Sequence, residues 1–346
     1  MNKYDAVVVS DYISIDLVIS VLLKTYFNPL YTWFFNLIFY FITRQELIIF
    51  LWLPIIIDVI YLILNLNDYF KLKLFGSCKL EKNDNILITG GSRGLGFKIV
   101  QNLVKTKLYQ NLIILDIKNL NFEPEYMVKN NIHYYYCNLN NVDEVSQLVD
   151  KILIKYQEIN LLINNAGIKE DSGTGFLNLK LNKFDELINT NLKSHFIILQ
   201  KIISNSIKNN TKLYVLTISS ILAFISPSNL SIYSSTKSSL LLLIESLFYE
   251  FYYKENLKFL VILPGQLDTP MFKNKIRKNS FKKQFLSPII ESNKLSLKII
   301  QLLEQGNTGW YFYPFYCNFI PLLKMLPLTI YHFLRLFSEM DKEIFE

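Results

Sequence analysis

Three residues in this chain have the types and spacing that proton-transfer chemistry requires. Tyr233 and Lys237 lie four residues apart in a stretch expected to be helical, so their side chains share one face. A phenol with a pKa of about 10 is a poor acid–base catalyst at neutral pH, and a nearby ammonium group is expected to lower that pKa. Ser220 ends an apolar strand, where its hydroxyl could bind a carbonyl or alcohol oxygen. This set predicts proton transfer at an alcohol or a carbonyl group.

A glycine-rich turn indicates a second kind of chemistry. The sequence Thr89-Gly90-Gly91-Ser92-Arg93-Gly94-Leu95-Gly96 follows the apolar run 85–88 and precedes a helix-like stretch. A strand, a glycine turn and a helix place a phosphate at the helix N-terminus, where free N–H groups and the positive dipole end meet the anion. The turn therefore predicts a site for the pyrophosphate of a dinucleotide.

Two residues bear on which dinucleotide is bound. Asp116 ends the second apolar strand, 20 residues after Gly96. A carboxylate there can accept hydrogen bonds from the ribose hydroxyls and repel a 2′-phosphate, which favours NAD. Arg93 lies in the glycine turn and could pair with that phosphate, which favours NADP. We expect NAD, with NADP as the alternative, because the acid would lie directly under the ribose.

The elements that must position these residues alternate regularly from residue 85 onward. The expected strands are 85–89, 111–116, 132–136, 160–164, 212–218, 257–263 and 309–313. The expected helical stretches are 94–106, 141–156, 183–208, 230–254 and 288–305. Continuously apolar strands separated by helices indicate a parallel sheet covered on both faces. The fold class is therefore α/β, a doubly wound parallel sheet. The scattered cysteines and histidines predict neither a disulfide framework nor a metal site.

Further motifs make the set specific. Asn164-Asn165-Ala166-Gly167 closes one strand, Asn191 lies in the next helical stretch, and Pro264-Gly265-Gln266-Leu267-Asp268-Thr269 follows a later strand. With the glycine turn and the Tyr/Lys pair, these motifs closely resemble the short-chain dehydrogenase/reductase superfamily over about residues 83–305. The resemblance implies a single-domain Rossmann fold and hydride transfer between a nicotinamide cofactor and an alcohol or carbonyl.

The resemblance also implies roles for individual residues. Tyr233 would transfer the proton, Lys237 would bind the nicotinamide ribose, and Ser220, rather than the neighbouring Ser219, would bind the substrate oxygen. Asn191 would hold a water in a proton relay, and Thr269 would bind the nicotinamide carboxamide. The family usually has an acid at the adenine, where this chain has Asn138 and Leu139. The cofactor-binding residues expected are Gly90, Ser92, Arg93, Gly94, Leu95, Gly96, Asp116, Asn138, Leu139, Asn165, Ala166, Gly167, Tyr233, Lys237, Pro264, Gly265, Leu267 and Thr269.

Composition points to a membrane. The 346 residues are 51% hydrophobic with a net charge of +7, and no helix-turn-helix, zinc finger or aromatic RNA motif supports nucleic acid as a partner. Two apolar stretches, Thr25 to Thr43 and Leu47 to Leu66, approach the roughly 20 residues that cross a bilayer. They predict a membrane segment that either spans the bilayer or dips into one leaflet; a buried helix pair is the alternative. We divide the chain into a membrane-associated region (1–80), a dehydrogenase domain (81–309) and an apolar tail (310–346).

The C-terminal third suggests a subgroup. Basic residues follow Thr269 without an intervening acid: Lys273, Lys275, Arg277, Lys278, Lys282 and Lys283. In the family this segment is a mobile lid over the substrate. An apolar anchor, a basic lid and an apolar tail resemble the membrane-bound retinol and 17β-hydroxysteroid dehydrogenase branch. The resemblance implies the endoplasmic reticulum or lipid droplets as the location, with the catalytic domain facing the cytosol.

We therefore expect an NAD(P)-dependent oxidoreductase that interconverts an alcohol and its ketone or aldehyde on a lipophilic substrate, such as a retinoid, sterol or long-chain lipid. One alternative is an NADPH-dependent reductase of lipid biosynthesis that acts on a 3-keto sphingoid base or an acyl ketone. Another is a non-catalytic, membrane-anchored binding protein on the same fold. The superfamily commonly forms dimers or tetramers, and the sequence neither supports nor excludes a homo-oligomer here.

Overall fold

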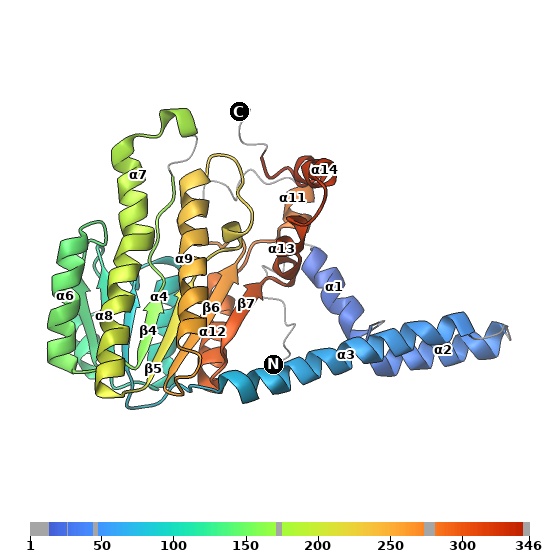
Figure 1. Cartoon of the computed structure of the whole chain (residues 1–346), viewed down its shortest axis with the longest axis horizontal. Helices are drawn as coiled ribbons and strands as arrows, with labels where there is room; N and C mark the ends of the chain where they lie inside the picture. Colours follow the sequence, from blue (N-terminus) through green and yellow to red (C-terminus); the bar gives the residue numbers. More distant parts are fainter. Residues whose placement is uncertain (1–13, 26, 44–47, 171–174, 273–280, 342–346) are drawn as a thin grey trace.

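The computed structural model describes residues 14–25, 27–43, 48–170, 175–272 and 281–341. Within them, seven parallel strands form one sheet in the order β3-β2-β1-β4-β5-β6-β7 (Figure 1). The strands are β1 (Asn85–Thr89), β2 (Asn111–Asp116), β3 (Ile132–Tyr136), β4 (Leu161–Asn164), β5 (Leu213–Ile218), β6 (Leu257–Pro264) and β7 (Gly309–Tyr313). The predicted doubly wound parallel sheet is confirmed.

Helices cover both faces of this sheet. Between β1 and β7 the described residues form the helices α4 (Gly94–Thr106), α5 (Pro124–Lys129), α6 (Val142–Tyr156), α7 (Leu181–Ile188), α8 (Ser194–Asn209), α9 (Ser231–Glu250), α11 (Phe281–Leu286) and α12 (Ser292–Gln305). Ile86 and Ile88 of β1 face a core that includes residues of α4 and α12, whereas Leu87 faces a core with α6, α8 and α9. Alternate strand residues point to opposite faces. An apolar residue is therefore needed at every position of a central strand.

Several predicted boundaries are corrected by the structure. The helical stretch expected over 183–208 is three segments: α7, a wider turn η2 (Asn189–Lys193) and α8. The stretch expected from residue 288 begins only at Ser292. Helix α5 was not anticipated, because its six residues are too few for an apolar periodicity to show.

The N-terminal region forms an arm beside the sheet. Its helices are α1 (Ile15–Lys24), α2 (Pro29–Thr43) and α3 (Ile48–Phe75), and α2 and α3 lie side by side and project from the domain (Figure 1). The indole nitrogen of Trp33 on α2 donates to Asp58 on α3 over 2.9 Å. Asp58, the acid in the apolar stretch Leu47 to Leu66, therefore has a hydrogen-bond partner. In the part of the chain that the structure describes, we find no helix long and apolar enough to span a membrane.

Helix α1 and the segment after β7 lie side by side at the edge of the sheet. After β7 come η4 (Phe315–Phe319), α13 (Ile320–Leu323) and α14 (Leu328–Ser338). Helix α1 docks there, because a carboxylate oxygen of Asp16 accepts the backbone N–H of Tyr316 over 3.0 Å. Cys78 and Leu80, which the sequence placed in the membrane region, are buried in the core of the sheet domain. Of the expected lid, Lys273, Lys275, Arg277 and Lys278 lie outside the described residues.

Candidate active site

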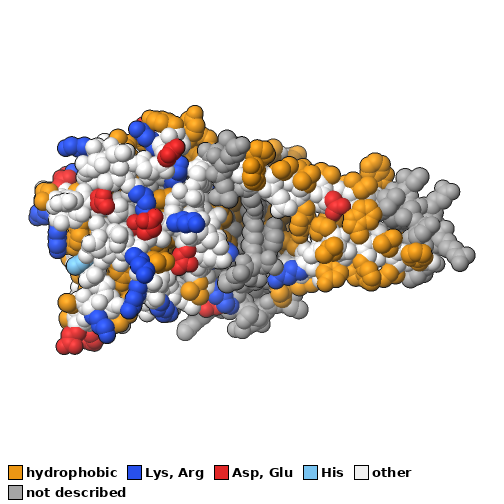
Figure 2. Space-filling view, turned by 90° about the horizontal axis from the view of Figure 1, so that it is seen from below, with side chains coloured by type: hydrophobic (Ala, Val, Ile, Leu, Met, Phe, Trp, Pro, Cys, Tyr) orange, Lys and Arg blue, Asp and Glu red, His pale blue; other side chains and the backbone are white. Residues whose placement is uncertain are grey.

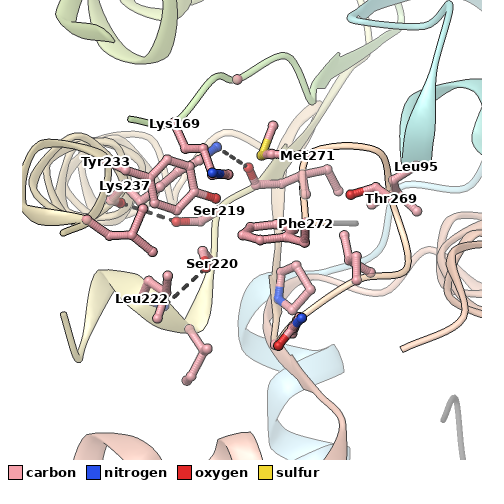
Figure 3. A pocket seen from close by; sticks show the side chains of 18 of the residues that line it. Leu95, Lys169, Ser219, Ser220, Leu222, Tyr233, Lys237, Thr269, Met271 and Phe272 are labelled. Atoms are coloured by element: carbon pink, nitrogen blue, oxygen red, sulfur yellow. Dashed lines mark hydrogen bonds between the residues drawn. The ribbon is translucent and has the colours of Figure 1, made fainter. Parts of the chain in front are cut away.

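The predicted site residues gather around one cavity at the carboxyl ends of the strands. The cavity has a volume of about 1280 Å³ and is lined by the glycine turn, the segment after β4, the residues after β5 and the start of α9. The end of β6 and the segment that follows it complete the wall. Figure 3 shows Tyr233, Lys237 and Ser220 on one side of this cavity, facing Thr269, Met271 and Phe272. In open α/β sheets this edge is where ligands bind.

Helix α9 and the end of β5 bring the three expected catalytic side chains together. The Ser220 hydroxyl is hydrogen-bonded to the Tyr233 phenol, and its oxygen also accepts the backbone N–H of Leu222 over 3.1 Å. The Ser219 hydroxyl instead donates to the carbonyl oxygen of Lys237 over 3.2 Å. Of the two serines, Ser220 is therefore the one positioned beside the phenol.

The electrostatics of the pair differ from the sequence expectation. Burial raises the pKa of the Tyr233 phenol to about 12, although the Ser220 hydrogen bond opposes this. The Lys237 nitrogen lies 5.9 Å from the centre of the Tyr233 ring. Burial also lowers the pKa of this amine to about 8. The net pKa of the phenol is therefore raised where a lower value was expected, because desolvation opposes charge on both groups.

Asn191 is fully buried in η2 and makes three hydrogen bonds. Its amide oxygen accepts the N–H of Ile168 over 2.8 Å, and its amide nitrogen donates to the Ile168 carbonyl over 2.8 Å. The same nitrogen donates to the Thr236 hydroxyl over 3.1 Å. Asn191 thus ties the segment after β4 to helix α9. A role in a water relay stays a prediction.

The glycine turn fits the phosphates of a dinucleotide. Gly90 and Gly94 adopt left-handed φ angles of 69° and 57°. A Cβ on Gly96 would collide with the carbonyl oxygen of Gly90, so α4 can begin this close to β1 only with glycine. The Ser92 hydroxyl is buried with no hydrogen-bond partner among the described residues, and no side-chain bond from Arg93 caps the start of α4. The unpaired hydroxyl and the N–H groups at this helix N-terminus suit an anion.

The position expected for the adenosine ribose is flanked by one acid and two cations. Asp116 is buried, and its two carboxylate oxygens accept the N–H groups of Ser92 and Lys118, each over 2.9 Å. Arg93 and Lys118 are exposed at the cavity rim. Asp116 therefore fixes the shape of the glycine turn and also presents its charge to the expected ribose position. Lys118 adds a second cation that the sequence analysis missed.

The remaining expected cofactor residues line the same cavity. The Asn165 amide nitrogen donates to the carbonyl oxygens of Thr89 and Gly90 over 3.1 and 3.0 Å, which fixes the glycine turn against the segment after β4. Thr269 is buried and lies against Gly94. The other lining residues are Leu95, Asn138, Leu139, Ala166, Gly167, Pro264, Gly265 and Leu267.

Comparison with known proteins agrees with this arrangement. A family model described as short chain dehydrogenase matches residues 84–280. The chain belongs to the short-chain dehydrogenase family. It is an oxidoreductase that acts on alcohol or carbonyl groups with NAD(P) as cofactor.

Individual relatives of this short-chain dehydrogenase differ in how much of it they cover. The uncharacterized oxidoreductase TDA5 of Saccharomyces cerevisiae is 32% identical over 265 residues, which are 75% of this chain and 77% of the yeast protein. The 3-oxoacyl-[acyl-carrier-protein] reductase FabG of Buchnera aphidicola is 33% identical over 124 residues, 35% of this chain and 48% of that protein. The solved structure of 4-hydroxyisoleucine dehydrogenase complexed with NADH has a TM-score of 0.60 at 22% identity, covering 66% of this chain and 96% of that chain.

The cavity of this short-chain dehydrogenase also has walls that the sequence analysis did not foresee. Ile15 and Ile19 of α1 line it, as do residues of η4, α13 and α14. Lys169 and Glu170, which follow the Asn-Ala-Gly motif, line it beside the catalytic residues. These segments are far apart in the sequence, and no local pattern marks them as neighbours. No sequence signal marks Glu170 either, because its burial depends on its contact with the start of α9.

Proposed function

We propose that this short-chain dehydrogenase interconverts a lipophilic alcohol and its ketone or aldehyde. The observation that carries the proposal is the apolar wall of the cavity beyond the catalytic residues. Side chains from six segments contribute to that wall: Leu222, Ile225, Leu230, Met271, Phe272, Leu286, Phe319, Ile320, Leu323, Leu334 and Phe337. An apolar wall with a few convergent polar groups suits a hydrophobic substrate held by one oxygen.

The chemistry assigns one task to each polar residue. When bound, the nicotinamide cofactor accepts or supplies the hydride. During oxidation the substrate hydroxyl proton passes to the Tyr233 oxygen, and during reduction the phenol returns it. Ser220 donates a hydrogen bond to the substrate oxygen. The Lys237 ammonium stabilises the transient phenolate and binds the ribose hydroxyls of the cofactor.

The arm supports a membrane as the source of such a substrate. Apolar side chains cover much of the α2–α3 arm in Figure 2, where charged side chains are sparse. Leu30, Phe34 and Phe41 of α2 are 81%, 56% and 74% exposed. Monomeric soluble proteins rarely expose contiguous apolar surface on this scale. We propose that the arm lies in the surface of a membrane, with the endoplasmic reticulum or lipid droplets as the location and the dehydrogenase domain on the cytosolic side.

Exposed apolar side chains next to the cavity extend this surface. Leu322 of α13 and Leu328, Phe333 and Leu336 of α14 are more than half exposed. The same helices, with α1, form the outer wall of the cavity. A lipophilic alcohol could therefore pass from the membrane to Tyr233 without crossing water. This arrangement favours the retinol and 17β-hydroxysteroid dehydrogenase branch.

A second candidate is a reductase of an acyl ketone or a 3-keto sphingoid base. The similarity to the 3-oxoacyl-[acyl-carrier-protein] reductase of Buchnera aphidicola favours it, as does the protonated state that burial imposes on Tyr233. With a raised pKa the phenol is protonated at neutral pH, which is the form that reduction of a carbonyl needs, whereas oxidation of an alcohol needs the phenolate. Preference for NADPH would distinguish this candidate from an NAD-dependent alcohol dehydrogenase.

An activity screen in detergent tests the proposal. Purified full-length protein is assayed with each of the four cofactor forms against retinol, 17β-hydroxysteroids and long-chain alcohols and ketones, with short polyols as the contrast. We expect turnover of the apolar compounds that the Tyr233→Phe variant lacks. Turnover confined to the short polyols would contradict a lipophilic substrate, and no turnover of any compound would contradict the catalytic proposal.

A further inference from the structure

Glu170 is a buried carboxylate that reaches the catalytic helix from another part of the chain. Its side chain is only 2% exposed. One oxygen accepts the backbone N–H groups of Ile232 and Tyr233, over 2.6 and 3.1 Å. Leu230, the N-cap residue of α9, makes no side-chain cap bond. Glu170 therefore caps α9 from the segment after β4, and it does so at the backbone of the proton-transferring residue.

The second oxygen of Glu170 has no hydrogen-bond partner among the described residues. The positive end of the α9 dipole and the two N–H donors suit a carboxylate there. Among the described residues only one of its oxygens is paired, so the other oxygen directs negative charge toward the surroundings of Tyr233. This charge raises the pKa of the Tyr233 phenol, in addition to the effect of burial.

Within the described part of the chain, three other ionisable side chains lie near Tyr233 or Glu170. Lys237 of α9 donates to the Ile218 carbonyl over 3.2 Å, and burial lowers its pKa to about 8, so most of it still carries a positive charge at pH 7.5. His195 of α8 is buried, and its pKa is lowered to about 4, so it is neutral at physiological pH. Lys169, beside Glu170 and shown in Figure 3, donates to the Glu170 backbone carbonyl over 3.1 Å.

We propose that Glu170 is a positioning residue for catalysis: it fixes the backbone of Tyr233, and its charge adds to the burial that keeps the phenol in the protonated, proton-donating form. The inference rests on the proposed role of Tyr233 as the group that transfers the proton. An ordinary N-cap needs only a serine, threonine, asparagine or aspartate next to the helix. A carboxylate supplied from more than 60 residues away adds charge and also couples the segment after β4 to the catalytic helix.

Acetylation of Tyr233 tests the charge without any substrate. N-acetylimidazole is small, neutral and reacts with phenolate, so the rate of Tyr233 acetylation, followed by peptide mass spectrometry at pH 7.5, reports the phenolate fraction. In Glu170→Gln the amide oxygen can still accept both N–H groups while the charge is lost. We expect Tyr233 to react measurably faster, at least about twofold, because well below the pKa the phenolate fraction rises in proportion to the acid dissociation constant of the phenol. Exposed Tyr252 is the internal reference.

Matched variants separate charge from geometry. Glu170→Asp keeps the charge and should react close to the wild-type rate. Asp150→Asn removes a surface carboxylate, paired with Lys201, and should leave the Tyr233 rate unchanged. If Glu170→Gln folds poorly, the same rate is measured in Leu230→Ser/Glu170→Gln, where serine provides a neutral cap. Equal rates in wild type and Glu170→Gln, or equal acceleration in the Asp and Gln variants, would overturn the inference.

The outcome is independent of the activity screen. Faster acetylation in Glu170→Gln supports the inference even in a preparation that turns over none of the compounds tested, whereas absent turnover counts only against the proposed function. Where a substrate is found, the same variant should shift the pH–rate profile for alcohol oxidation to lower pH. A residue that only capped the helix would not move that profile.

Discussion

The Lys237 amine donates a hydrogen bond to the carbonyl oxygen of Ile218, the last residue of β5, over 3.2 Å. Both ends of this bond are buried, and the lysine is only 3% exposed. An ammonium group in such a place has lost most of its water, which is why its pKa falls to about 8. The catalytic site therefore carries a cost in stability that a simpler side chain would avoid.

Lys237→Met should stabilise the folded protein while abolishing turnover. The folded-state pKa of about 8 lies below the ordinary 10.5, so the cost of the buried charge is full below pH 8 and disappears as pH rises toward 10.5. This pKa shift corresponds to a loss of about 3 kcal/mol in the free energy of unfolding of the wild type. The methionine variant recovers that amount less about 1 kcal/mol, because it also loses the hydrogen bond. We expect the methionine variant to unfold at a higher temperature at pH 7, and the difference from wild type to shrink by pH 10. A difference that does not change with pH would assign the gain to packing rather than to charge.

Tyr233→Phe should eliminate turnover and leave cofactor binding unchanged. The ring still fills its buried site, and only the oxygen that transfers the proton is lost. Lys237→Ala should impair both properties, because the ammonium group serves the ribose as well as the phenol. Cofactor fluorescence titrations and single-turnover assays on the two variants measure this. If the Tyr233→Phe variant kept a turnover rate close to that of the wild type, another group would have to transfer the proton.

The sheet could be predicted from the sequence because its signals are local. Each central strand is a continuous apolar run, and each cofactor motif lies at the end of such a run. The alternation of apolar runs and helical stretches therefore locates the strands and the cofactor motifs together. The proximity of the three expected catalytic residues followed from the same logic, since Tyr233 and Lys237 share a helix face and Ser220 lies just after β5. The break at Asn191 was missed, because the wide turn that buries this amide depends on contacts with Ile168 and Thr236.

The charge states of the buried side chains, and the cavity walls that distant segments form, could not be predicted from the sequence. The sequence places Lys237 near Tyr233 but does not show how little water remains around either, and burial decides the direction of both pKa shifts. Likewise, nothing in the sequence near Asp16 indicates that this residue binds the backbone of Tyr316. That contact makes α1 a wall of the cavity instead of part of a separate anchor.

NAD(H) should bind at least about tenfold more tightly than NADP(H), which is about 1.4 kcal/mol. Asp116 is buried and fixed by two backbone N–H groups, so it cannot swing away from a 2′-phosphate. Two like charges about 4 Å apart repel by about 4 kcal/mol at an effective dielectric of 20. The exposed cations Arg93 and Lys118 offset part of that repulsion by attracting the 2′-phosphate. Asp116→Asn should therefore narrow or reverse the preference, and Arg93→Gln should widen it. Equal affinities in the wild type, measured by fluorescence titration, would contradict the prediction.

Charges placed on the arm should release the protein from membranes. Ile56, Ile60 and Ile63 of α3 are each about half exposed, and a membrane is the apolar partner that we propose for them. Point substitutions are sharper than removal of residues 1–80, because that truncation would also delete Ile15 and Ile19 from the cavity and Cys78 from the core. The triple glutamate variant should move from the membrane fraction to the supernatant. The matched control is Ile154→Glu, on helix α6 of the dehydrogenase domain, where the isoleucine is 79% exposed.

The same triple variant should keep its activity on short soluble alcohols and lose most of its activity on a substrate dissolved in vesicles. The physical reason is that the active site is untouched while its access to the lipid phase is lost. Burying one large apolar side chain contributes about 1.5–3 kcal/mol. Three such losses, together with three added charges, should therefore outweigh a reversible surface association. Flotation with lipid vesicles at neutral pH, with both assays run on each variant, measures the effect. If neither the wild-type chain nor the Ile154→Glu control floats with the vesicles, membrane association is wrong and the lipophilic substrate must rest on the cavity wall alone.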